Sequence, residues 1–147
     1  MARADYYAIE KGVKVTLEAD LALQGVRYFI EEEVTWADSV PAVFIYLDSR
    51  DAAPEEQRLA ASTRVDYLVN LSLWCIDGHF DSLELASQAR SDLVGKVEVA
   101  LLKDPTLDSS VDYSWLEGGE FMNARDDQSG FITAGEVRLV AKVHATT

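Results

Sequence analysis

The side chains best suited to metal binding lie far apart in this sequence. His79 and His144 are separated by 65 positions, and neither belongs to a His-Glu-x-x-His segment or a paired-cysteine pattern, the spacings that hold zinc in proteins. The single cysteine, Cys75, excludes an intrachain disulfide and is expected to be a small buried hydrophobe within a strand. We therefore expect no metal and no cofactor.

Patterns for nucleophilic, phosphate and acid–base chemistry are also missing. The chain contains no Gly-x-Ser-x-Gly, no Gly-x-x-x-x-Gly-Lys-Ser/Thr and no Gly-x-Gly-x-x-Gly segment. Its 26 carboxylates show no spacing that singles out a catalytic pair. Asp126 and Asp127, followed by Ser129 and Gly130, lack the register and the trailing glutamate of a calcium loop and indicate a turn. The sequence thus predicts a protein that is not an enzyme.

The acidic charge is concentrated in two segments. The formal charge of the chain is −13, and residues 31–56 and 104–127 carry −7 and −6 of it. Such segments are typical of solvated connections, while a surface that repels an anion or docks a basic partner is the alternative. The acidity argues against a nucleic-acid grip, which needs clustered lysine and arginine. No apolar run is long enough to span a bilayer and no signal peptide opens the chain, so we expect no membrane association.

The N-terminal part of the chain has a broadly helical pattern. Apolar residues at four-residue spacing predict a helix over residues 9–33, although Gly12 and Gly25 leave two shorter helices as an alternative. After Pro41, the β-branched and aromatic residues 42–47 predict a short strand covered on both faces. The connection 48–62 is long for a hairpin loop, and long loops in compact domains are usually functional or disordered.

The clearest strand pattern covers residues 63–76. Apolar residues alternate with polar ones, as in an antiparallel strand with one solvated face. At about fourteen residues it exceeds the usual strand length, so it must curve strongly or extend beyond its own domain to another partner. Trp74 lies on the otherwise polar face and is expected to mark a contact with another subunit, whereas Trp36 and Trp115 are expected in the core or an interface.

A long helix and two strands complete the expected fold. Asp81 and Glu84 form a capping-box pattern that starts a helix over residues 82–102, and strands follow at 111–115 and 137–143. The predicted order is helix, strand, strand, helix, strand, strand. We expect one α+β domain over residues 1–147, with an N-terminal helical segment (1–36) and a core (37–147) in which two helices pack on one face of an antiparallel sheet.

The arrangement of these segments resembles the tail terminator (tail completion) proteins of long-tailed bacteriophages. The resemblance covers most of residues 9–144 and rests on order rather than on a specific motif. The segments that carry it are the N-terminal helix, Pro-Ala-Val-Phe-Ile-Tyr (41–46), the acidic loop, Arg-Val-Asp-Tyr-Leu-Val-Asn-Leu (64–71), Ser-Gln-Ala-Arg-Ser-Asp-Leu (87–93), Leu-Leu-Lys-Asp-Pro (101–105) and Glu-Val-Arg-Leu-Val (136–140).

This resemblance implies a structural virion protein of the phage tail and neck, assembled in the host cytoplasm. Its copies would form a hexameric ring that caps the tail tube, ends its polymerisation and docks the head–tail connector proteins. DNA would pass through the ring without specific binding. Residues expected to contact a neighbouring subunit or the tail-tube protein are Asp48, Arg50, Asp51, Glu55, Glu56, Arg58 and Trp74. Acids expected to face the lumen are Glu117, Glu120, Asp126 and Asp127.

Two alternatives remain open at this point. The first is a head–tail connector or another minor tail protein, because these share the same layout of elements. The second is an acidic cytosolic α+β binding or adaptor domain that uses its acidic loops against a basic partner.

Overall fold

The computed structural model describes residues 4–33, 40–52, 64–126 and 130–146. These residues form an α+β fold with two α-helices, a short 3₁₀ helix and a mixed six-stranded sheet, so the predicted α+β class is confirmed. The elements are α1 (Tyr6–Glu18), η1 (Leu21–Leu23), β1 (Arg27–Ile30), β2 (Ala42–Ala52), β3 (Arg64–His79), α3 (Leu83–Lys103), β4 (Tyr113–Gly118), β5 (Phe121–Asp126) and β6 (Gly130–Thr146).

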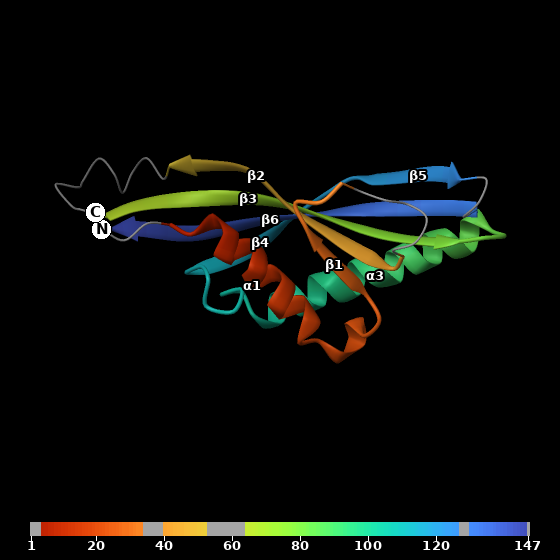
Figure 1. Cartoon of the computed structure of the whole chain (residues 1–147), viewed down its shortest axis with the longest axis horizontal. Coiled ribbons are helices and arrows are strands. Elements are labelled where there is room, and N and C mark those ends of the chain that lie inside the picture. The colour runs from red at the N-terminus through yellow and green to blue at the C-terminus, as the bar shows by residue number, and fades with distance from the viewer. Residues whose placement is uncertain (1–3, 34–39, 53–63, 127–129, 147) are drawn as a thin grey trace.

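The sheet is built around the long antiparallel pair β3 and β6 (Figure 1). The strand order is β1-β2-β3-β6-β4, and β5 pairs with β6 beyond the end of β4. The predicted order of elements is therefore incomplete, since β1 and β5 are additional strands. The expectation of a purely antiparallel sheet is wrong, because β1 runs parallel to β2.

The predicted helix over residues 9–33 is three separate elements. Asp5 caps α1 by accepting the N–H of Ala8 at 3.0 Å, and α1 ends at Glu18. Asp20 then caps η1, and Gly25 has a φ of 86°, a conformation that favours glycine and turns the chain into β1. Phe29 and Ile30, which suggested a continued helix, lie in β1, where parallel pairing with β2 replaces the helical hydrogen bonds.

The long strand predicted around residues 63–76 is confirmed and finds its partner within the same chain. Its 16 residues pair with β6 from Arg64↔Thr146 to His79↔Phe131. Ladder bonds to β6 along the full length, and to β2 along the middle, explain why so long a strand holds together. The long central helix is also confirmed, but its N-cap is Ser82 rather than Asp81, since the Ser82 hydroxyl accepts the N–H of Leu85 at 3.2 Å.

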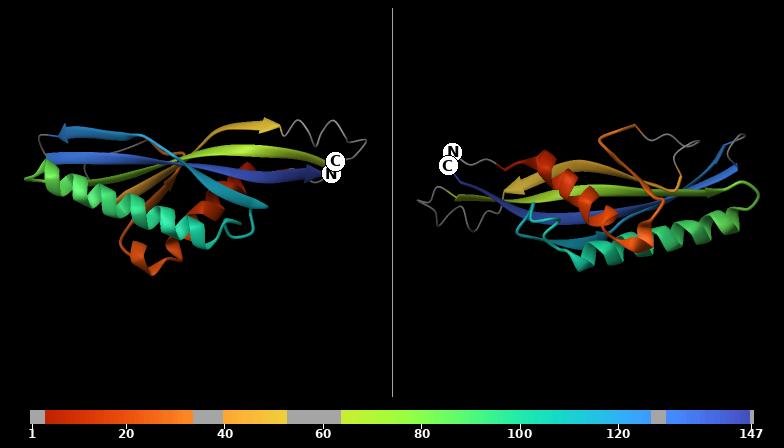
Figure 2. Two further views of the ribbon diagram at one scale, coloured as in Figure 1. Left: turned by 180° about the vertical axis from the view of Figure 1, so that it is seen from behind. Right: turned by 60° about the horizontal axis from the view of Figure 1, so that its bottom comes forward.

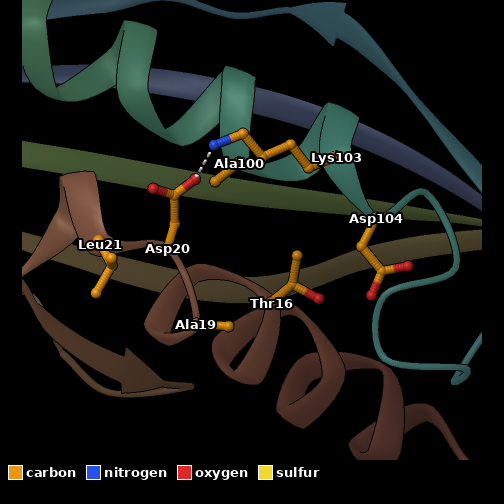
Figure 3. Close-up of a pocket in the computed structure, with 7 residues that line it drawn as sticks. All are labelled: Thr16, Ala19, Asp20, Leu21, Ala100, Lys103 and Asp104. Carbon is orange, nitrogen blue, oxygen red and sulfur yellow. Dashed lines mark hydrogen bonds and ion pairs between the residues drawn. The ribbon is translucent and has the colours of Figure 1, made fainter.

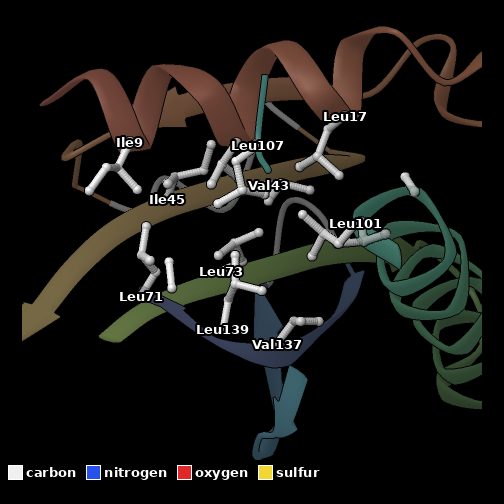
Figure 4. Close-up of a cluster of buried hydrophobic side chains, with 14 of the residues drawn as sticks. Ile9, Leu17, Val43, Ile45, Leu71, Leu73, Leu101, Leu107, Val137 and Leu139 are labelled. Atoms are coloured by element: carbon white, nitrogen blue, oxygen red, sulfur yellow. The ribbon is translucent and has the colours of Figure 1, made fainter. Parts of the chain in front are cut away.

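Both α-helices pack on the same face of the sheet, called here the helix face (Figures 1 and 2). Figure 4 shows the side chains of α1 and α3 meeting those of β2, β3 and β6 in the main core. Large members of this core include Ile9, Leu17, Val43, Ile45, Leu71, Leu73, Leu101, Leu107, Val137 and Leu139. Alternation along each strand places these residues on one side of the pleat.

The opposite face, called here the far face, carries a smaller apolar cluster. Phe44 is 1% exposed and stacks on Phe29 with ring centroids 4.9 Å apart. Trp74, opposite Phe44 in the β2–β3 register, is half-buried at the edge of this cluster. The expectation of a solvated far face therefore holds only in part, because aromatic packing on β1–β3 buries its centre.

Candidate functional site

Three of the residues expected to contact a neighbouring subunit lie in the last part of β2. They are Asp48, Arg50 and Asp51. Among the described residues, β1 pairs only with Ala42–Ile45, so Asp48–Ala52 is bonded to β3 on one side alone. A bulge between Leu47 and Ser49 shifts the register before this end. The Asn70 amide donates to Ser49 at 3.0 Å and to Asp51 at 3.2 Å, which fixes the strand end on β3.

Arg50 lies between two tyrosines on the helix face. Its guanidinium donates to the Tyr6 hydroxyl at 2.6 Å and stacks 5.2 Å from the Tyr6 ring and 4.8 Å from the Tyr67 ring. The hydrogen bond to Tyr6 raises the pKa of Arg50 above its usual range. Arg50 thus ties the start of α1 to β2 and β3, an intramolecular role that sequence reasoning did not anticipate.

A buried carboxyl, also missed from the sequence, lies beside this strand end. Glu10 is 4% exposed, and its Oε2 has no hydrogen-bond partner in the described residues. Burial, together with the neighbouring carboxyl of Glu31, raises the pKa of Glu10 to about 8. Glu31 in turn accepts the N–H of Leu47 at 2.8 Å. The available signal was the position of Glu10, directly after the buried Ile9 on the apolar stripe of α1.

Trp74 belongs to a polar and aromatic arrangement on the far face. Across the β3–β6 ladder it pairs with Glu136, whose carboxylate accepts from Ser72 and, at 2.9 Å, from Arg138. Arg138 also lies 3.7 Å from Glu120. Because these charges are satisfied within the chain, this part of the far face is pre-ordered rather than loosely solvated.

The remaining candidate acids lie on the opposite sheet edge from Asp48 and Asp51. Glu117 accepts the indole N–H of Trp115 at 3.0 Å on β4, and Glu120 lies between β4 and β5. The structure therefore gathers the candidates into two groups at two edges. Glu55, Glu56, Arg58, Asp127 and Trp36, and the side chain of Asp126, lie outside the described residues.

The residues suited to metal or nucleophilic chemistry remain apart in the fold. His144 pairs with Asp112 at 3.0 Å, His79 accepts the N–H of Asp81, and burial raises the pKa of the Cys75 thiol. Within the described ranges, no three histidine, cysteine or acidic side chains form a metal-binding group. No described helix is long and apolar enough to cross a membrane.

The helical side carries a groove where η1 meets the end of α3 (Figure 3). It encloses about 380 Å³ between Thr16, Leu21 and Ala100, and Lys103 crosses it to reach Asp20 at 3.0 Å. The N–H of Ala22 and the ammonium of Lys103 lower the pKa of Asp20. Asp20 and Lys103 are thus engaged with each other and hold η1 against α3.

The fold and these sites describe a small α+β protein whose ordered polar groups chiefly fix its own elements. A scan against protein-family models finds no match, and a search of curated proteins finds no relative.

Proposed function

We propose that this chain is a structural subunit of a phage tail, forming a ring that caps the tail tube, stops its growth and leaves a channel for DNA. The proposal draws on the order of segments that resembles the tail terminator proteins. The observation that carries it is the one-sided architecture, in which α1 and α3 cover one face while strand edges are left open among the described residues.

A ring needs two different surfaces on each subunit, because cyclic closure by heterologous contacts joins unlike patches of neighbouring copies. The sheet offers two unlike edges, the end of β2 on one side and β4–β5 on the other. Asp48 and Asp51 belong to the first edge, and Glu117 and Glu120 to the second. We propose Asp48 and Asp51 at a subunit contact, and Glu117 and Glu120, which lie in β4 and before β5 rather than within β5, at the lumen.

The acidity of the chain suits a conduit for DNA. Phosphates are repelled by carboxylates and retained by clustered lysine and arginine, so an acidic wall lets a duplex pass without holding it. The partners we propose are further copies of the chain, the tail-tube protein and the head–tail connector proteins, with the virion neck as the location.

Electron microscopy and native mass spectrometry of the purified protein test the proposal. We expect a ring of six copies with a central hole near the width of duplex DNA, and decoration of the ends of purified tail tubes. Twelve copies would favour a connector ring instead. A chain that stays monomeric beside tail tubes and never occupies their ends would refute the proposal, and binding to an unrelated basic protein alone would favour an adaptor.

A further inference from the structure

Each of the two edges of the sheet has a stretch of strand that is paired on one side only among the described residues. On the β2 side, Glu31 has a φ of 52° and its side chain caps the N–H of Leu47, so pairing with β1 stops there. Beyond this point, Asp48–Ala52 presents one row of main-chain groups with no strand beside it among the described residues. On the other side, β5 is bonded to β6 alone within the same part of the chain. Unpaired edges of this kind are templates for a strand from another chain.

The two edges differ in the charges beside them: acids gather around the end of β2, whereas Arg90 and Arg125, together with Glu120, lie beside β5. The β2 end is surrounded by exposed acids, while its one arginine, Arg50, is held by Tyr6 and Tyr67. These acids are Glu31, Glu32, Glu33, Asp48 and Asp51. At β5, Arg90 stacks 5.0 Å from the ring of Phe121, and Arg125 stacks 5.5 Å from the ring of Phe131.

The β5 edge also exposes apolar surface. Phe121 is 67% exposed and Met122 is 47% exposed, although both lie in a regular strand. Arg90 donates to the main-chain carbonyl of Met122 at 3.1 Å and to the Asn123 side chain at 2.7 Å, which orders the strand. Aromatic and arginine side chains on an ordered surface are the composition typical of protein interfaces.

We propose that copies of this chain associate head to tail, with β5 of one copy adding as a strand to the Asp48–Ala52 end of β2 in the next. The contact buries Phe121 and Met122 and pairs main-chain groups that are open at both edges. It also brings Arg125 of β5, with Arg90 of α3 beside that strand, toward the acids around β2. This inference rests on the proposed function, because it names the surfaces through which the ring would close.

Site-specific cross-linking of the full chain tests this contact. Asp51 accepts from Asn70 on the far face, Ser49 shares that hydrogen-bonding partner, and Met122 pairs with Ala134 on the same face. Ser49→Cys and Met122→Cys therefore place thiols on one side of the proposed joint. A bis-maleimide long enough to reach two residues along a strand will link the thiols even if the two strands pair in a register shifted by two residues. The native Cys75 is fully buried and is therefore protected from the reagent.

We expect a cross-linked dimer when the two variants are mixed, and none when either is treated alone. A chain carrying both substitutions should yield a ladder of multimers. Glu18→Cys, on the exposed side of α1, mixed with Met122→Cys is the matched control that should not cross-link. A mixture without heterodimer, or equal cross-linking of one variant with itself, would overturn the head-to-tail contact.

Charge exchange gives an independent readout. Arg125→Glu should lower the yield of heterodimer several-fold at low salt, and the loss should shrink as salt is added. Lys96→Glu, a reversal on α3 beside Asp92, should leave the yield unchanged. An equal loss of heterodimer in Arg125→Glu and Lys96→Glu would contradict the proposed contact between β5 and β2.

The outcomes also separate this contact from the proposed function. Rings without the Ser49–Met122 cross-link would refute the contact alone. Cross-linked copies that form no ring and never occupy tail ends would refute the tail function and leave the contact standing.

Discussion

Glu10 is a carboxyl whose position in the fold sets its protonation. Burial on α1 and the nearby Glu31 raise its pKa from 4.5 to about 8, so the folded state keeps a proton that the unfolded chain loses near pH 4.5. The contribution of Glu10 to stability is therefore greatest below pH 4.5 and declines as the pH rises from 4.5 to about 8. Above about pH 8, Glu10 is a buried carboxylate beside the carboxyl group of Glu31.

Glu10→Gln should remove this decline. At pH 5 the variant and the parent should unfold at similar urea concentrations, whereas at pH 9 the variant should be more stable by about 2 kcal/mol. The measurement is the difference between their free energies of unfolding across pH 4 to 9. Glu18→Gln, an exposed acid on the same helix, should show no such growing difference. A difference in free energy of unfolding between Glu10→Gln and the parent that stays constant across this pH range would contradict a raised pKa for Glu10.

At the scale of elements, tight packing at Gly12 fixes how α1 meets the segment after α3. A Cβ at Gly12 would lie 2.2 Å from the carbonyl oxygen of Leu107 and 2.4 Å from the hydroxyl of Ser110. The sequence pattern treats Gly12 simply as a weak point of a helix. The structure gives it a role, since only glycine lets the backbones approach so closely.

Gly12→Ala should therefore destabilise the protein by about 1–3 kcal/mol, despite the higher helix propensity of alanine. Gly95 in α3 is the matched control, because a Cβ there meets no atom within 4 Å. Gly95→Ala should stabilise by up to about 1 kcal/mol. Chemical denaturation of both variants gives the comparison, and a gain for both would show that the Gly12 contact relaxes freely.

The far-face cluster is the second packing feature at this scale. Phe44→Ala should cost about 3–5 kcal/mol, because it removes a fully buried ring and leaves a cavity against Phe29. Phe80→Ala is the matched control, since Phe80 is 65% exposed and its loss should change stability by less than about 0.5 kcal/mol. Thermal unfolding measures both, and a small effect at Phe44 would mean that the far face is solvated.

At the scale of the whole molecule, the placement of the acids at two sheet edges predicts how assembled rings interact with DNA. If Glu117 and Glu120 face the lumen, replacing both with lysine should make assembled rings retain linear duplex DNA at low salt, and added salt should release it. Electrophoretic mobility of rings mixed with DNA is the measurement. Glu18→Lys is a control reversal on α1, and retention by that variant alone would place the lumen elsewhere.

Patterns confined to a single segment made much of the fold predictable. The alternation around β3, the capping signal and stripe of α3, and the strand at β2 each depend on neighbours within a few residues. β1 and β5 escaped prediction because a four-residue strand and a six-residue edge strand are defined by their pairing partners. Trp74 was placed on the correct strand. Asp48 and Asp51 were expected in a long connection after residue 47, but β2 continues through them to Ala52, and the tie made by Arg50 was not foreseen.

The sequence by itself determined the α+β class, the long strand, the central helix and the acidic surface, because periodicity and composition are local properties. Only the tertiary structure decided that β1 runs parallel to β2, that Glu10 is buried beside Glu31, and that β2 and β5 end as unlike edges of one sheet. Those features arise from contacts between segments distant in the chain, and the free energy of such contacts overrides local preference.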